Sequence, residues 1–180
     1  MLTTGDEAVV EQARSERNQG RATDMNWLLH DRLGFNYRMS DVTAALGVAQ
    51  LERLDTLLAE RARVAGLYRE RLSAIEGLVL PCEDEGPERR SWFVYVVQLP
   101  EEVDRDGLVG GLAEQGIASK AYLPVIHLQP HYRERFGYRG GEFPVAEAVA
   151  ARSLALPFFT TMGESEVERV AQGLQAALGQ

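Results

Sequence analysis

The side chains best suited to chemistry lie in a short polar turn, Asn36-Tyr37-Arg38, just before a helix start. A carboxamide, a phenol and a guanidinium all carry hydrogen-bond donors. Ser40 is a good N-cap because its hydroxyl can accept from free N–H groups of the first turn, and Asp41 suits the positive end of the helix dipole. Donors beside a helix N-terminus can bind an anion. The turn therefore predicts anion binding, with a plain surface loop before a capped helix as the alternative.

A second group of candidates surrounds the loop expected over residues 123–143, which is rich in aromatic and basic side chains. Tyr122 precedes this loop and His127 lies within it. Loops with such side chains are places where a sugar or a nucleotide diphosphate finds partners. His30 could similarly contact a phosphate or a substrate. For all three residues, packing at the surface is the alternative interpretation.

Groups for catalysis or metal binding are scarce in this sequence. His127 and His131 are four residues apart, but Pro130 lies between them and no third ligand is evident, so no metal site is predicted. The single cysteine, Cys82, cannot form an internal disulfide and fits a reducing cytosol. We interpret it as an incidental loop thiol. The only lysine, Lys120, lies in an alternating stretch and is expected to be a solvated strand residue.

Length and charge exclude several classes of protein. The chain has 180 residues, 45% of them hydrophobic, which is enough for a core in one large domain or two small ones. Its formal charge of −8 argues against nucleic acid or an anionic membrane surface as a partner. The sequence has no apolar run near the roughly 20 residues that span a bilayer, and no signal-peptide pattern at its start.

The helices and strands that must position these groups alternate along the chain. Thr4 and Glu7 form a predicted capping box, and that helix should run to Arg17. Apolar residues then recur at threes and fours from Asp41 to about Gly77, which predicts one long helix. A kink is possible near Gly66. The remaining expected elements are a strand over 92–99, a helix over 104–115, a strand over 117–122, a short helix over 130–135, a helix over 144–152, a strand over 153–158 and a closing helix over 164–178.

Several blocks of sequence resemble one enzyme family. The run Leu33–Asp41 with Ala44–Gly47 and Gln50–Asp55 is similar to the DegT/DnrJ/EryC1/StrS family of pyridoxal-phosphate (PLP) sugar aminotransferases. Further blocks follow in the family's order along nearly the whole chain. They are Gly116-Ile117, Tyr122–Pro124, His127–Pro130, Tyr132–Phe136, Phe143–Glu147 and Ser153–Pro157.

The resemblance implies an α/β fold, namely the C-terminal part of a fold-type-I PLP transferase. Residues 1–40 would be a remnant of the large PLP-binding domain, 41–77 a long connecting helix and 78–180 the small C-terminal α/β domain. The strand-like start over 1–4 matches a position soon after the family's Schiff-base lysine. We therefore expect that lysine upstream of Met1, in an N-terminal lobe that this chain lacks, and no catalytic residue within the chain.

The family also implies roles for the turn. The residue matching Asn36 reaches across a homodimer to the PLP phosphate of the other subunit, so Asn36 is the first candidate for cofactor binding, followed by Arg38 and Tyr37. The family often has a histidine before the strand over 92–99, whereas Arg89, Arg90 and Ser91 stand there in this chain. The resemblance therefore implies no substrate-binding role for these three residues.

The implied activity is amino transfer from glutamate or glutamine to a keto-sugar linked to a nucleotide, in a cytoplasmic enzyme. Because the chain lacks a lysine at the matching position, we expect it to be inactive alone. Two alternatives stay open. One is a related PLP- or pyridoxamine-phosphate-dependent sugar dehydratase, and the other is a non-catalytic module that retains a dimer surface or a sugar-nucleotide pocket.

Overall fold

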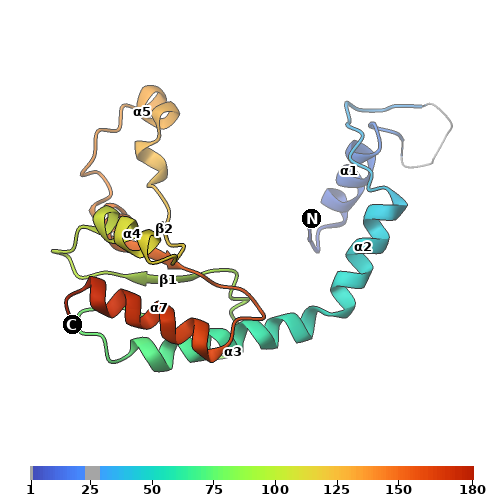
Figure 1. The fold of residues 1–180 in the computed structure, drawn as a ribbon. Helices are drawn as coiled ribbons and strands as arrows, with labels where there is room; N and C mark the ends of the chain where they lie inside the picture. Colours follow the sequence, from blue (N-terminus) through green and yellow to red (C-terminus); the bar gives the residue numbers. More distant parts are fainter. Residues whose placement is uncertain (1, 23–28) are drawn as a thin grey trace. The chain divides into compact units, whose positions relative to one another are not determined.

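The computed structural model describes residues 2–22 and 29–180, which form two compact units (Figure 1). The first unit ends at Arg53, and the second comprises Leu54–Gln180. Both combine helices with extended segments, and the second contains a three-stranded sheet. Among the described residues, no helix is long and apolar enough to cross a membrane.

The first unit contains two helices, α1 (Glu7–Arg17) and α2 (Asp41–Glu52). Ser40 caps α2 as predicted, since its Oγ accepts from the Thr43 N–H at 3.3 Å. The predicted Thr4 cap of α1 is wrong, because Asp6 takes that position and accepts from the N–H groups of Ala8 and Val9. Residues 2–4 form no strand either.

The predicted single helix over 41–77 is wrong in its continuity and its end. It is interrupted at Arg53, and α3 (Leu54–Leu72) follows. Arg53 has φ −100° and ψ 1°, and its N–H binds the Gln50 carbonyl, which tightens the last turn of α2. The helix is unbroken at Gly66, which lies inside α3 where an added Cβ would meet open space. Glycine in a helix interior costs about 1 kcal/mol relative to alanine.

The sheet of the second unit has the order β1-β3-β2, with β3 antiparallel to both neighbours. It consists of β1 (Tyr95–Gln98), β2 (Lys120–Ala121) and β3 (Ser153–Leu156), all shorter than predicted. Tyr95 pairs with Leu156 and Gln98 with Ser153. The helices between the strands are α4 (Arg105–Glu114), the 3₁₀ turn η1 (Ile126–Leu128), α5 (Pro130–Phe136) and α6 (Pro144–Arg152), and α7 (Glu164–Ala177) closes the chain.

The core of this unit lies between the sheet and the adjacent helices. Helices α3 and α7 lie side by side, and α7 also contacts α4 (Figure 1). Alternate residues of β1 are buried, as the period of a half-covered strand requires. The fully buried side chains of most volume include Tyr68 and Leu72 from α3, Tyr95 from β1, Leu154 from β3 and Leu174 from α7. Burial of these apolar side chains stabilises the fold of the second unit.

Candidate functional site

The backbone of the polar turn is attached to the end of α1. The N–H of Phe35 donates to the Glu16 carbonyl at 2.6 Å, and the N–H of Tyr37 donates to the Arg17 carbonyl at 2.9 Å. In return, the N–H of Gln19 donates to the Phe35 carbonyl at 2.8 Å. The carbonyls of Glu16 and Arg17 belong to the last turn of α1, which has no helical donors for them. Asn36 is therefore held by hydrogen bonds on both sides of it in sequence.

Two glycines allow this close approach. Gly20 has φ +75°, and a Cβ added there would overlap the Arg32 carbonyl. A Cβ added to Gly34 would overlap the backbone nitrogen of Gly20. Only a residue without a side chain fits such contacts, and Gly20 also needs the left-handed conformation. The sequence alone did not predict this contact.

The side chains of the turn are presented to solvent. Arg38 Nε donates to Asn36 Oδ1 at 3.0 Å, and both residues are exposed. The rings of Phe35 and Tyr37 stack with centroids 5.0 Å apart and planes 8° apart. Asn36 and Arg38 thus bring amide and guanidinium donors together just before α2, where Ser40 is the N-cap. This donor set fits one end of an anionic group such as a phosphate.

His30 lies in the same unit as Asn36. Arg21 and His30 form an isolated antiparallel bridge, as do Asn18 and Asn36. His30 is exposed. The segment over 18–21 therefore pairs with His30 at Arg21 and with Asn36 at Asn18.

Tyr122 and His127 lie together in the second unit. They line an apolar cleft of about 710 Å³ formed by residues around η1, α5 and α6. His127 contacts Phe143 with ring centroids 4.7 Å apart and Tyr138 edge-on at 5.8 Å. The walls contain no Lys, Arg, Asp or Glu. The structure thus brings these two predicted residues together, in a cleft suited to an uncharged ring better than to a diphosphate.

Two carboxylates that sequence reasoning missed stand beside His127. Its Nε2 lies 2.9 Å from Glu147 Oε1, and both Glu147 oxygens accept from the Gly141 N–H, at 2.9 and 2.8 Å. Glu142 accepts from the N–H groups of Arg139 and Gly140. These backbone hydrogen bonds, from Gly141 above all for Glu147 and from Arg139 for Glu142, hold the pKa of each carboxyl below its usual range.

His127, Glu142 and Glu147 place one possible metal-ligating atom each within 4.8 Å of one another. Every carboxylate oxygen of the two glutamates already accepts an N–H from the loop over 139–143 or from His127. The cluster is therefore explained by its role in shaping that loop. A signal was present in sequence, because a glutamate in the first turn of α6 can reach free N–H groups.

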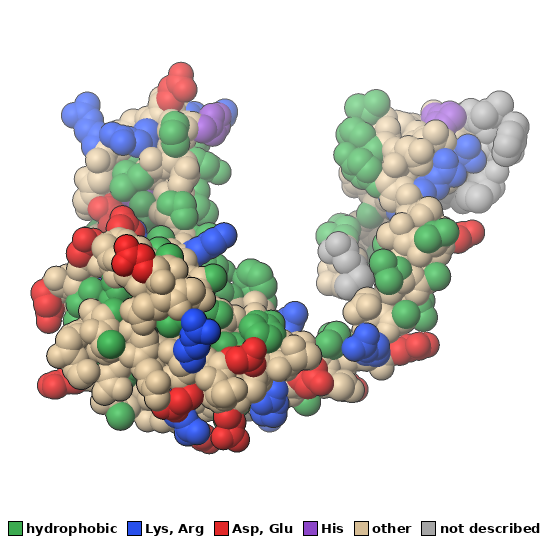
Figure 2. Space-filling model, viewed as in Figure 1, with side chains coloured by type: hydrophobic (Ala, Val, Ile, Leu, Met, Phe, Trp, Pro, Cys, Tyr) green, Lys and Arg blue, Asp and Glu red, His purple; other side chains and the backbone are tan. Residues whose placement is uncertain are grey.

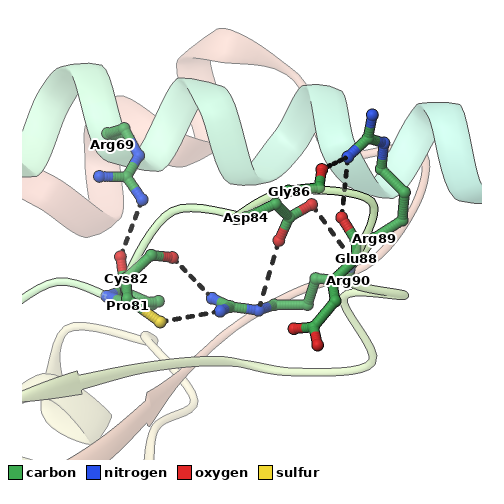
Figure 3. Close-up of polar contacts among 8 residues, drawn as sticks. All are labelled: Arg69, Pro81, Cys82, Asp84, Gly86, Glu88, Arg89 and Arg90. Atoms are coloured by element: carbon green, nitrogen blue, oxygen red, sulfur yellow. Dashed lines mark hydrogen bonds and ion pairs between the residues drawn. The ribbon is translucent and has the colours of Figure 1, made fainter.

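Two arginines that precede the predicted strand over 92–99 organise the loop over 81–90 (Figure 3). Arg90 donates to the Cys82 carbonyl at 2.8 Å and lies 2.9 Å from Cys82 Sγ, with its Cζ 4.8 Å from the centre of the Trp92 ring. Arg89 donates to the carbonyls of Gly86 and Glu88. Both arginines thus serve local structure, and Cys82 is an exposed free thiol.

Lys120, the only lysine, is exposed on β2 and pairs through its backbone with Ala155. This confirms the predicted solvated strand lysine. The donors of Asn36 and Arg38 lie in the first unit, whereas the only lysine of the chain lies in the second.

The profile of the DegT/DnrJ/EryC1/StrS aminotransferase family matches residues 1–175. The chain belongs to this family. Among curated relatives of the family, GDP-perosamine synthase of Caulobacter vibrioides is 32% identical over 99% of this chain and 47% of its own length. The spore coat polysaccharide biosynthesis protein SpsC of Bacillus subtilis is 30% identical over 97% of this chain and 48% of its own length.

A solved structure shares the fold. DesV of S. venezuelae, determined in complex with a ketimine intermediate, matches with a TM-score of 0.86 and 27% identity. The match covers 99% of this chain and 46% of DesV. The chain therefore spans about half the length of the relatives and the structure it matches, consistent with the predicted C-terminal part of a PLP aminotransferase fold.

Proposed function

We propose that this chain forms part of a PLP-dependent aminotransferase that converts a nucleotide-linked keto-sugar to an amino-sugar, with an amino acid as donor. Membership of the family supports amino transfer, and the similarity to GDP-perosamine synthase of Caulobacter vibrioides supports a nucleotide-linked sugar. The observation that carries the proposal is the pair of donors on Asn36 and Arg38 beside the start of α2. PLP supplies an electron sink for the chemistry at the substrate's amine carbon.

In this proposal, Asn36, Arg38 and Tyr37 hold the cofactor at its phosphate end. The Asn36 carboxamide and the Arg38 guanidinium donate hydrogen bonds to phosphate oxygens. Tyr37, stacked on Phe35, provides a phenol and a flat wall beside them. None of these groups can form a Schiff base, so the lysine that does so comes from another part of the enzyme. Residues 1–40 would complete a large PLP-binding domain, residues 41–77 would link it to the small domain, and residues 78–180 would form the small domain.

The other predicted residues would contact the substrate. The cleft that contains Tyr122 and His127 is apolar apart from phenol, hydroxyl and imidazole groups, which suits the uncharged base of a nucleotide. His30, an exposed imidazole in the unit that carries Asn36, would contact a phosphate or sugar hydroxyl. The diphosphate itself would need cations from outside this cleft.

The exposed surface of α2 supports a partner that covers it. None of its residues is buried, and its only charged residues are Asp41 and Glu52 at the ends. Exposed hydrophobic side chains, green in Figure 2, occur along this part of the first unit. Val42 is 83% exposed and Leu51 is 68% exposed. An uncharged apolar surface of this kind is typical of an interface. We propose that a second subunit of a cytoplasmic homodimer covers it and shares the PLP site.

The test replaces Asn36 with Ala in the enzyme assembled from this chain and the lysine-bearing part. Asn36→Ala should weaken PLP retention about tenfold, because a charge-assisted hydrogen bond to phosphate is lost. PLP release during dialysis, followed by its absorbance, measures this, and circular dichroism checks the fold. Asn18→Ala is the matched control, since it makes the same change in the same unit. Equal PLP retention in the two variants would count against the proposal.

A further inference from the structure

The orientation of the Asn36 carboxamide decides what this residue can bind. An asparagine side chain presents an acceptor on one side and a two-hydrogen donor on the other. Turned one way, Asn36 would offer its NH₂ group to a ligand, and turned the other way it would offer its oxygen. Only the first orientation attracts an anion such as a phosphate, because the second directs a partial negative charge at it.

The backbone of Asn36 is already fixed, which leaves only its side chain to be oriented. The N–H groups of the residues on each side, Phe35 and Tyr37, are bound to the end of α1. The close contact between Gly20 and Gly34 restrains the backbone on the N-terminal side of the same segment. Because the backbone is fixed, any group that selects one of the two carboxamide orientations also decides where the NH₂ donor and the oxygen acceptor of Asn36 lie.

Arg38 is that group. Its Nε lies 3.0 Å from Asn36 Oδ1. A guanidinium carries five N–H donors and no acceptor, so the carboxamide atom that faces it must be the oxygen. The Asn36 NH₂ group is then turned away from Arg38, with both hydrogens available to a ligand.

We propose that Arg38 is a positioning residue, which fixes the Asn36 carboxamide with its NH₂ group directed at the cofactor phosphate. The inference rests on the proposed function for its ligand, but the orientation itself does not depend on it. A hydrogen bond through Nε uses one of the five donors, so the guanidinium keeps its charge and four further N–H donors. The pair acts as one unit that favours a phosphate over a neutral hydroxyl group.

The experiment uses the 180-residue chain labelled with ¹⁵N and two variants that each remove one positive charge. Arg38→Met removes the donor to Asn36. Arg32→Met is the control, because Arg32 pairs with Asp31 in the same unit and has no recorded contact with Asn36. The first measurement is the heteronuclear NOE of the Asn36 side-chain nitrogen without any ligand. The second is the shift of its NH₂ resonances on titration with inorganic phosphate.

Without ligand, the NOE should be high in the unchanged chain and in Arg32→Met, and should fall in Arg38→Met. Backbone resonances of Phe35 and Tyr37 should stay in place in all three. With phosphate, Arg38→Met should weaken the response of Asn36 about tenfold and Arg32→Met by about twofold at most.

The two ways to fail are distinct. If the NOE of Asn36 is the same in Arg38→Met and Arg32→Met, or if the backbone of the turn moves in Arg38→Met, the positioning role is wrong. If the NOE behaves as expected but phosphate leaves Asn36 unaffected in the unchanged chain, the orientation stands and the proposed phosphate ligand is wrong.

Discussion

The rings of Tyr68 and Tyr95 stack in the core of the second unit with centroids 4.8 Å apart, yet among the described residues only the Tyr68 hydroxyl has a hydrogen-bond partner. Tyr68 Oη donates to the Pro157 carbonyl at 2.6 Å. Tyr95 Oη is buried and has no hydrogen-bond partner among the described residues. The Tyr68 hydroxyl therefore stabilises the fold, whereas burial of the Tyr95 hydroxyl destabilises it.

This relationship predicts opposite effects of the same substitution. Tyr95→Phe should raise the free energy of unfolding by about 1 kcal/mol, because it removes a buried hydroxyl that bonds to nothing. Tyr68→Phe should lower it by about 1 kcal/mol or somewhat more, because the Pro157 carbonyl loses its donor. Urea unfolding followed by circular dichroism measures both values. A loss of stability in Tyr95→Phe would show that its hydroxyl has a partner in solution.

The same two residues predict a loss of stability at high pH. Burial raises the pKa of Tyr95 to about 12, and burial together with the nearby Tyr95 raises the pKa of Tyr68 above its usual range. An unfolded tyrosine has a pKa of about 10, so the stabilisation is complete below that pH and is lost as the pH rises through the folded-state pKa. Urea unfolding between pH 9 and about 12 should show a falling midpoint. Tyr95→Phe should make that fall less steep, and an equal slope would contradict the assignment.

The close contact between Gly20 and Gly34 in the first unit predicts that Gly34 tolerates no side chain. Gly34→Ala should destabilise this unit by about 2–4 kcal/mol, because its Cβ overlaps the backbone of Gly20. Gly47→Ala is the matched control, since nothing lies within 4 Å of an added Cβ and alanine favours a helix interior by about 1 kcal/mol. Hydrogen exchange of the Gln19 and Phe35 amides measures the difference. Normal protection in Gly34→Ala would show that the contact is looser than the structure indicates.

The hydrogen bonds of Glu142 and Glu147 predict that the loop over 139–143 opens at low pH. Backbone donors hold the pKa values of Glu142 and Glu147 below the ordinary range, so their stabilisation is present above about pH 4.3 and is lost as the pH falls through the folded-state values. The amide protons of Gly140 and Gly141 should then lose protection from exchange. Glu147→Gln should reduce the protection of Gly141 at neutral pH as well. Glu134→Gln, on the exposed α5, is the control and should leave it unchanged.

Local chemistry was sufficient to predict several elements from the sequence. Ser40 caps α2 as predicted. The helices predicted to begin near residues 104, 130 and 144 also form, with Asp104 as the cap of α4 and Pro130 and Pro144 in the first turns of α5 and α6. These signals are readable because a cap or a first-turn proline acts within a few residues. The sequence blocks also identified the family, which the profile match over residues 1–175 confirmed.

Tertiary structure alone decided the arrangement of the candidate sites. The break at Arg53 has no proline or glycine to mark it, and the pairing of Phe35 with Glu16 joins segments that are far apart in sequence. The contact of Gly20 with Gly34, and that of His127 with Glu147, likewise depend on how the chain folds back. The sequence determined which donors Asn36 and Arg38 carry. The folded backbone brought them within 3.0 Å of each other and so decided which side of the Asn36 amide is turned outward, because hydrogen bonding depends on distance and direction in space.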